Sequence, residues 1–108
     1  MAQGIARGDI WMFEFKAPDK RRPVLVISRP DAIAVLRTVI VAPITSTIYG
    51  IPSEVVLGIA HGLKGPSAAN FDHVQVVDRA RLRKYVGRAG LDEMRLACAA
   101  LAIATGCS

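Results

Sequence analysis

The sequence has no apolar run near the roughly 20 residues that a membrane-spanning helix needs. Its first residues also lack the basic-then-apolar pattern of a secretory signal. Internal repeats and low-complexity tracts are absent as well. From these absences we expect a cytoplasmic protein that does not enter a membrane.

Cysteine and histidine are scarce, with two of each in 108 residues. Cys98 and Cys107 stand nine positions apart in a segment of helical periodicity, too far along a helix to bridge. We therefore expect free thiols in a reducing compartment, with an intermolecular disulfide as the alternative. The cysteines and histidines show no ligand spacing for zinc, so we expect no metal site and no cofactor.

Apolar residues make up 52% of the chain and charged residues 21%, a composition typical of a folded protein. At this length we expect a single domain, residues 1–108. The net charge is +5, and ten of the fourteen basic residues are arginine. Because the arginine guanidinium matches phosphate oxygens, this bias favours nucleic acid as a partner.

Two β-branched runs, Arg22–Ser28 and Thr38–Ser46, predict buried strands with polar residues at their ends. From Gly90 onward the apolar residues follow a helical period. We expect a mainly β fold with a C-terminal helix (α+β), built as a small bent sheet or barrel. Further short strands are predicted at 8–15, 53–57, 67–71, 74–78 and 85–88, and the helical stripe contains Leu91, Met94, Ala97, Cys98, Leu101 and Ala104.

The polar ends of the two long runs are predicted to meet in an antiparallel hairpin. If Pro23 lies opposite Pro43, Arg22 stands beside Ile44 and Thr45. A guanidinium next to a hydroxyl suits an anionic target such as a phosphodiester. Arg22 and Thr45 are therefore the leading site candidates.

Four blocks of sequence carry a family resemblance, and their order and spacing cover nearly the whole chain. The blocks are Arg7–Trp11, Arg21–Ile27, Val41–Ser46 and Pro52–Leu57. Together they resemble the MazF/PemK toxin family. The resemblance implies an SH3-like or CcdB-like barrel, a homodimer, and metal-independent cleavage of RNA at short sequences. It also implies a cognate antitoxin whose extended, acidic segment occupies the RNA groove.

The same resemblance places the family's arginine on Arg22 and its strand-ending hydroxyl on Thr45. Such cleavage can use the 2′-hydroxyl of RNA as nucleophile, which leaves a 2′,3′-cyclic phosphate and a 5′-hydroxyl. Arg22 would stabilise the charge at phosphorus, and Thr45 would hydrogen-bond the 2′-hydroxyl or a phosphoryl oxygen. Neither residue suits the transfer of protons.

Two departures from the family pattern bear on the site. The loop before Arg22 is shortened to Lys16–Arg21, and an Asp72-His73 pair replaces the usual Asp-Gln pair. His73 is a candidate for proton transfer, with a plain turn residue as the alternative. The candidate RNA-binding or auxiliary residues are Lys20, Arg21, Ser46, Tyr49 and His73.

Other conspicuous residues are expected to be structural. Trp11 alternates with core residues of its strand, so we expect it to be buried rather than to stack on a base. His61 is expected to be a solvated loop residue. The basic cluster at Arg79, Arg81, Arg83, Lys84 and Arg88 is expected to be a solvated face, with RNA backbone contact as the alternative.

Two other functions fit the same residues. One is a CcdB-like inhibitor that binds a topoisomerase and cuts nothing. The other is a catalytically silent basic barrel that binds RNA or acts only with its partner. The fold would not distinguish these functions from a nuclease.

Overall fold

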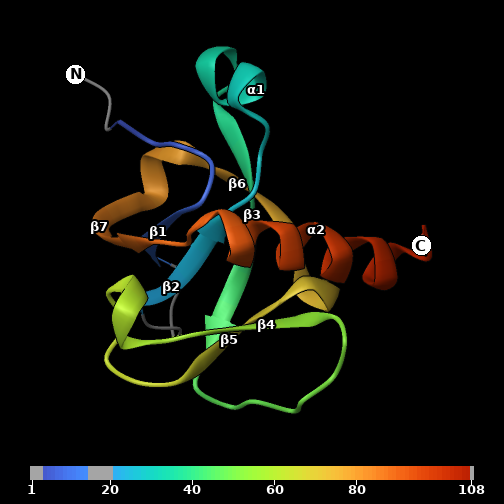
Figure 1. Ribbon diagram of the computed structural model, residues 1–108. Helices are drawn as coiled ribbons and strands as arrows, with labels where there is room; N and C mark the ends of the chain where they lie inside the picture. Colours follow the sequence, from blue (N-terminus) through green and yellow to red (C-terminus); the bar gives the residue numbers. More distant parts are fainter. Residues whose placement is uncertain (1–3, 15–20, 108) are drawn as a thin grey trace.

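The computed structural model describes residues 4–14 and 21–107. Within them the chain forms seven strands, two α-helices and three 3₁₀ turns (Figure 1). The expected mainly β fold with a C-terminal helix is confirmed. The strands are β1 (Asp9–Glu14), β2 (Arg21–Val26), β3 (Thr38–Thr45), β4 (Glu54–Leu57), β5 (Ser67–Asn70), β6 (Gln75–Asp78) and β7 (Leu82–Arg88). The helices are α1 (Pro30–Val35) and α2 (Leu91–Thr105), and the 3₁₀ turns are η1 (Ile59–His61), η2 (Phe71–His73) and η3 (Arg79–Arg81).

Strand β3 connects two parts of an antiparallel sheet with the order β4-β5-β3-β2-β1-β7. Its first half, Thr38–Val41, pairs with β6, and Ile44 and Thr45 pair with β5. Pro43 lies where β3 changes partner, and the missing proline N–H is tolerated at such an interruption. The change of partner turns β4 and β5 away from the rest of the sheet (Figure 1).

The sheet has a hydrophobic core on each face, which explains why β2 is apolar at successive positions. Leu25 and Ile27 point into the core beneath α2, whereas Val24 and Val26 point into a second core with Trp11. Strand β3 alternates in the same way, because Ala42 and Ile44 belong to the first core and Val39 and Val41 to the second. A strand covered on both faces has no polar side in its central part.

Helix α2 lies across the sheet and packs against β4 and η2 (Figure 1). Its most buried residues are Ala97 and Ala100, and it is capped after Thr105 by Gly106, which adopts the left-handed conformation with φ of 73°. Leu91 and Cys98 of the predicted stripe are exposed on the single chain, whereas Met94, Leu101 and Ala104 pack partly buried against the core. The small side chains of Ala97 and Ala100 allow the helix to lie close to the sheet.

Several predicted boundaries also shift. Strand β3 ends at Thr45, one residue before the end of the predicted run, and Ile40 within it is 39% exposed, so this strand is not buried throughout. Strand β7 begins at Leu82, three residues before the predicted start. The predicted loop 16–21 lies outside the described residues except for Arg21, which opens β2. No helix in the described ranges has the length and apolar character needed to cross a membrane.

Candidate nucleic-acid site

The pairing of β2 with β3 places Arg22 and Thr45 on the same face of the sheet. The observed register joins Val24 to Pro43 and Val26 to Val41. Continued by two residues beyond the last observed pair, this register would set Arg22 opposite Thr45 and on the same face; directly opposed residues of paired strands have Cβ atoms roughly 5 Å apart. Both residues extend the sheet face of the second core.

The predicted register was wrong by one residue. It paired Pro23 with Pro43, whereas Val24 occupies that position. Because side chains alternate across a strand, the predicted register would have left Arg22 and Thr45 on opposite faces. The observed register sets Ile44 opposite Pro23 and buries Ile44 in the first core, beneath α2.

Arg22 and Thr45 line one pocket with a volume of about 380 Å³. Strands β2 and β3, the loop after β3, the end of β5, η2 and the start of β6 all contribute to it. The full lining is Arg22, Pro43, Ile44, Thr45, Thr47, Tyr49, Asn70, His73 and Gln75. One permanent cation is thus surrounded by hydroxyl, amide and imidazole groups, and the described lining contains no carboxylate.

The Arg22 side chain is exposed and has no ion pair or hydrogen bond with another described residue. Its guanidinium is therefore free to bind a phosphoryl group through two N–H donors. The Thr45 hydroxyl oxygen accepts a hydrogen bond from the Thr47 N–H at 3.2 Å. The Thr45 hydroxyl proton remains available for donation into the pocket.

Two carboxylates outside the pocket lining fix the segments that form its walls. Glu54 accepts hydrogen bonds from the N–H groups of Tyr49 and Gly50, at 3.1 and 3.0 Å to Oε1. This contact holds the loop that carries Tyr49, whose side chain is 69% exposed. Asp72 accepts a hydrogen bond of 2.6 Å from the Ser53 hydroxyl, which ties η2 to the start of β4.

The structure brings four of the candidate residues together and separates others. Arg22, Thr45, Tyr49 and His73 line the pocket. Arg21 and Ser46 are exposed and are sequence neighbours of Arg22 and Thr45, but they do not line the pocket. Lys20 lies outside the described residues. The sequence reasoning missed Thr47, Asn70 and Gln75. Asn70 and Gln75 lie on β5 and at the start of β6, which pair with β3 only in the folded chain.

Arg83, Lys84 and Arg88 of the basic cluster are exposed, as expected for a solvated face, but three arginines of the cluster also make structural contacts. Arg79 donates to the carbonyl oxygens of Ile33 and Leu36 and so secures α1, whereas Arg81 donates to the Glu14 carbonyl and lies over the Phe13 ring. Arg88 forms an ion pair of 2.7 Å with the buried carboxylate of Asp9. These arginines stabilise the fold and are less available to RNA than their sequence suggests.

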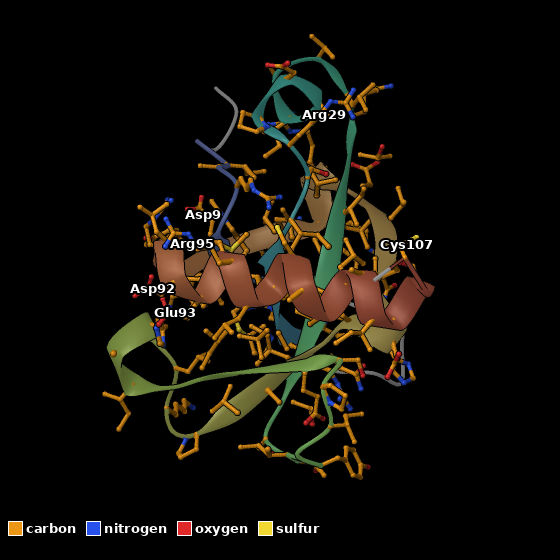
Figure 2. The ribbon with its side chains drawn as sticks, turned by 45° about the vertical axis from the view of Figure 1, so that its right-hand side comes forward. Asp9, Arg29, Asp92, Glu93, Arg95 and Cys107 are labelled. Carbon is orange, nitrogen blue, oxygen red and sulfur yellow. The ribbon has the colours of Figure 1, made fainter. Side chains whose placement is uncertain are left out.

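Trp11 is buried, as expected, and its indole N–H donates to Asp9 at 3.3 Å. The expectation for His61 was wrong, since its two ring nitrogens both have partners. Nδ1 accepts from the Gly58 N–H, and Nε2 lies 3.4 Å from the Glu93 carboxylate. Figure 2 shows Glu93 at the start of α2, directed toward η1. His61 therefore joins η1 to α2.

Among the described residues, no group of three or more histidine, cysteine, aspartate or glutamate side chains is placed to hold a metal ion. Cys98 and Cys107 are both free and exposed.

The chain matches known proteins over almost its full length. Residues 6–105 match the family described as PemK-like, MazF-like toxin of type II toxin-antitoxin system. The chain is 45% identical over 104 residues to a Mycobacterium tuberculosis protein named probable endoribonuclease MazF5, covering 95% of this chain and 94% of that relative.

Solved structures agree with this match. The M. tuberculosis toxin MazF-mt6 superposes with a TM-score of 0.84 at 29% identity, covering 93% of this chain and 98% of that one. A MazE-MazF crystal structure from Deinococcus radiodurans gives a TM-score of 0.76 at 28% identity, covering 95% and 96% of the two chains. The chain therefore belongs to the PemK-like, MazF-like toxins of type II toxin-antitoxin systems.

Proposed function

We propose that this toxin is a metal-independent, sequence-specific endoribonuclease that cuts single-stranded RNA. The observation that carries the proposal is the pocket in which Arg22 and Thr45 share one face of the sheet. A relative named probable endoribonuclease, 45% identical over nearly the whole chain, supports the same activity.

In the proposed reaction the 2′-hydroxyl oxygen attacks the adjacent phosphorus. The O2′–P bond forms as the P–O5′ bond breaks, which leaves a 2′,3′-cyclic phosphate and a 5′-hydroxyl. Arg22 would bind two non-bridging oxygens and stabilise the charge that develops on them. Thr45, opposite Arg22 in the register, would hydrogen-bond the 2′-hydroxyl or a phosphoryl oxygen.

Residues around the pocket are proposed to bind the flanking RNA. The exposed Arg21, together with Lys20, would contact neighbouring phosphates, and Ser46 would add a hydrogen bond. Tyr49 has an exposed ring on a loop fixed by Glu54, which suits stacking on an unpaired base.

We further propose a cytoplasmic, single-domain toxin that forms a homodimer and is neutralised by a cognate antitoxin. An unpaired arginine in a pocket without a described carboxylate favours an acidic antitoxin segment that competes with RNA for Arg22. The similar crystal structure from D. radiodurans is that of MazE-MazF, a pairing that supports such a partner.

The comparisons give no support to the alternative of a CcdB-like topoisomerase inhibitor. Incubation of the purified protein with mixed RNA in a chelator, together with a gyrase assay, separates the functions. Cleavage that disappears in Arg22→Ala and Thr45→Ala supports the nuclease. Intact RNA with inhibited gyrase would support the inhibitor, and RNA binding without cleavage would support the silent barrel.

The chain offers matched controls for both substitutions. Arg37 and Thr38 are exposed and lie at the opposite end of β3 from Thr45. Arg37→Ala and Thr38→Ala remove the same side chains outside the pocket, so we expect both variants to cleave RNA at the wild-type rate. Equal losses in the controls and in the pocket variants would contradict the assignment of the site.

A further inference from the structure

Arg22 and Thr45 leave one requirement of RNA cleavage unmet, namely acceptance of the proton from the 2′-hydroxyl. An arginine stays protonated at any physiological pH and cannot accept a proton. The Thr45 hydroxyl has only the Thr47 N–H as a described partner, and no described base activates it. Another group in the pocket has to act as the base.

His73 lies on the wall of the same pocket, at the end of η2. This turn is anchored at its start, just before His73. Asn70 accepts a hydrogen bond of 2.8 Å from the Asp72 N–H, and Phe71 is 2% exposed in the core beneath α2. The backbone that carries His73 is therefore anchored, whereas its imidazole has no described hydrogen-bond partner.

The other titratable groups around His73 are less suited to the role. Asp72 is bound to the Ser53 hydroxyl and does not line the pocket, and the Glu54 carboxylate accepts from two backbone amides. Tyr49 offers a phenol, a side chain used less often than imidazole as a general base.

No competing base comes from the elements behind η2. On the other side of Phe71, Arg7 and Cys98 line a separate small pocket. Helix α2 faces Phe71 with Ala97 and Leu101, which line this small pocket and cannot act as bases. The charged residues of α2 lie in its first two turns.

We propose that His73 is the general base of the reaction, an inference that rests on the proposed endoribonuclease function. Its neutral imidazole accepts the 2′-hydroxyl proton as the O2′–P bond forms. The P–O5′ bond breaks in the same step, and the leaving oxygen takes a proton from solvent water at the open pocket. Imidazole is the side chain that most often serves as a general base near neutral pH.

The test is the pH dependence of kcat/KM for RNA cleavage in a chelator between pH 5 and 9. We expect the wild-type value to fall about tenfold per pH unit on the acid side, as the imidazole becomes protonated. His73→Gln should be about 100-fold slower or more, and this acid limb should disappear. Added imidazole should restore part of the activity of His73→Ala.

Two further measurements separate catalysis from binding and from folding. The affinity of His73→Gln for a 2′-deoxy oligonucleotide, which cannot react, should equal that of the wild type. The matched control is His61→Gln, the same substitution at the histidine that joins η1 to α2, and it should keep the acid limb.

Each contrary result has a distinct meaning. If His73→Gln keeps the wild-type rate and pH profile while Arg22→Ala is inactive, the role of His73 is refuted and the nuclease function stands. A loss confined to oligonucleotide affinity, or no rescue by imidazole, refutes the base role as well. If the wild-type protein produces no cyclic-phosphate ends, the proposed function itself fails.

Discussion

Arg22 is a permanent positive charge without a described partner, and it lines a pocket whose described residues include no carboxylate. Several arginines in the second half of the chain are different. Arg79, Arg81 and Arg88 donate to backbone oxygens or to a buried carboxylate. An arginine that contributes no such contact is available for a ligand, and its side chain should contribute little to folding stability.

Substitution of Arg22 should therefore reduce activity without unfolding the protein. We expect Arg22→Ala to lose about 3 kcal/mol of transition-state stabilisation, measured as the change in kcat/KM. The kcat/KM of Arg22→Lys should fall between those of the wild type and Arg22→Ala, because lysine keeps the charge but cannot bind two oxygens with a planar fork. Thermal unfolding should be unchanged in both variants, and a lysine variant with full activity would contradict the bidentate role.

The sequence predicted which residues meet at the site but not how they meet. The ends of two β-branched runs identified Arg22 and Thr45, yet the register was wrong by one position. A run that is apolar at every position contains no period-2 signal, so it cannot distinguish one register from the next. Asn70 and Gln75 were missed because they approach the pocket from strands that pair with β3 only in the folded chain.

The junction of η1, β7 and α2 shows how elements distant in sequence are held together. The backbones of residues 61–62 and 86–87 approach closely. A Cβ atom on Gly87 would lie 2.0 Å from the His61 carbonyl oxygen, and one on Gly62 would lie 2.2 Å from that of Val86. Gly62, between β4 and β5, and Gly87, in β7, are thus required by packing.

Gly87→Ala should destabilise the protein because the new methyl group would collide with backbone, which cannot move aside like a flexible side chain. We expect a loss of about 3 kcal/mol in the free energy of unfolding, measured by urea denaturation. Gly65→Ala is the control, since a Cβ on Gly65 would meet no atom within 4 Å. Equal stability of the two variants would show that the backbones of residues 61–62 and 86–87 are not as close as described.

Glu93 should make the start of α2 sensitive to acid. Hydrogen bonds from the backbone N–H groups of Glu93 and Gly90, and then the contact with His61, lower the pKa of the Glu93 carboxyl from its usual value. The folded state therefore binds this proton less readily than the unfolded chain. The stabilisation is complete above the unfolded pKa of about 4.3 and is lost as the pH falls through the lower folded-state pKa.

Glu93→Gln should remove the pH-dependent stabilisation that the Glu93 carboxylate provides. The variant should be less stable than the wild type near pH 6, and the difference should shrink as the pH falls toward 3, measured by urea denaturation at each pH. In a His61→Gln background the substitution should keep most of its effect, because the backbone hydrogen bonds are the larger cause. Stability curves that run parallel from pH 6 to 3 would contradict the account.

At the scale of the whole molecule, the charge of +5 gives RNA binding a dependence on salt. If Lys20, Arg21 and Arg22 each neutralise one phosphate, the logarithm of the affinity should fall with the logarithm of salt with a slope of about −2. Arg21→Ala should reduce this slope by about 0.7, whereas Arg37→Ala should not. The salt dependence of each protein can be measured by fluorescence anisotropy with a 2′-deoxy oligonucleotide. A slope for Arg21→Ala equal to that of the wild type would exclude Arg21 from the RNA interface.

The family and fold class could be predicted from the sequence because both depend on features spread over the chain. The order of the four blocks and the change from strand to helix periodicity near Gly90 survive errors at single positions. The roles of individual charged residues could not be predicted, as His61 and Arg81 show. Their partners, Glu93 and the Glu14 carbonyl, are separated from them by 32 and 67 positions, and only the fold brings them into contact.

The chemistry of the cut ends is the most direct test of a pocket in which Arg22 and Thr45 act on one phosphodiester. RNA cleaved by the purified protein in a chelator should end in a 2′,3′-cyclic phosphate and a 5′-hydroxyl. A single 2′-deoxy nucleotide on the 5′ side of the cut should abolish cleavage, because it removes the nucleophile. Cleavage that persists at that position, or ends that carry a 5′-phosphate, would contradict the account.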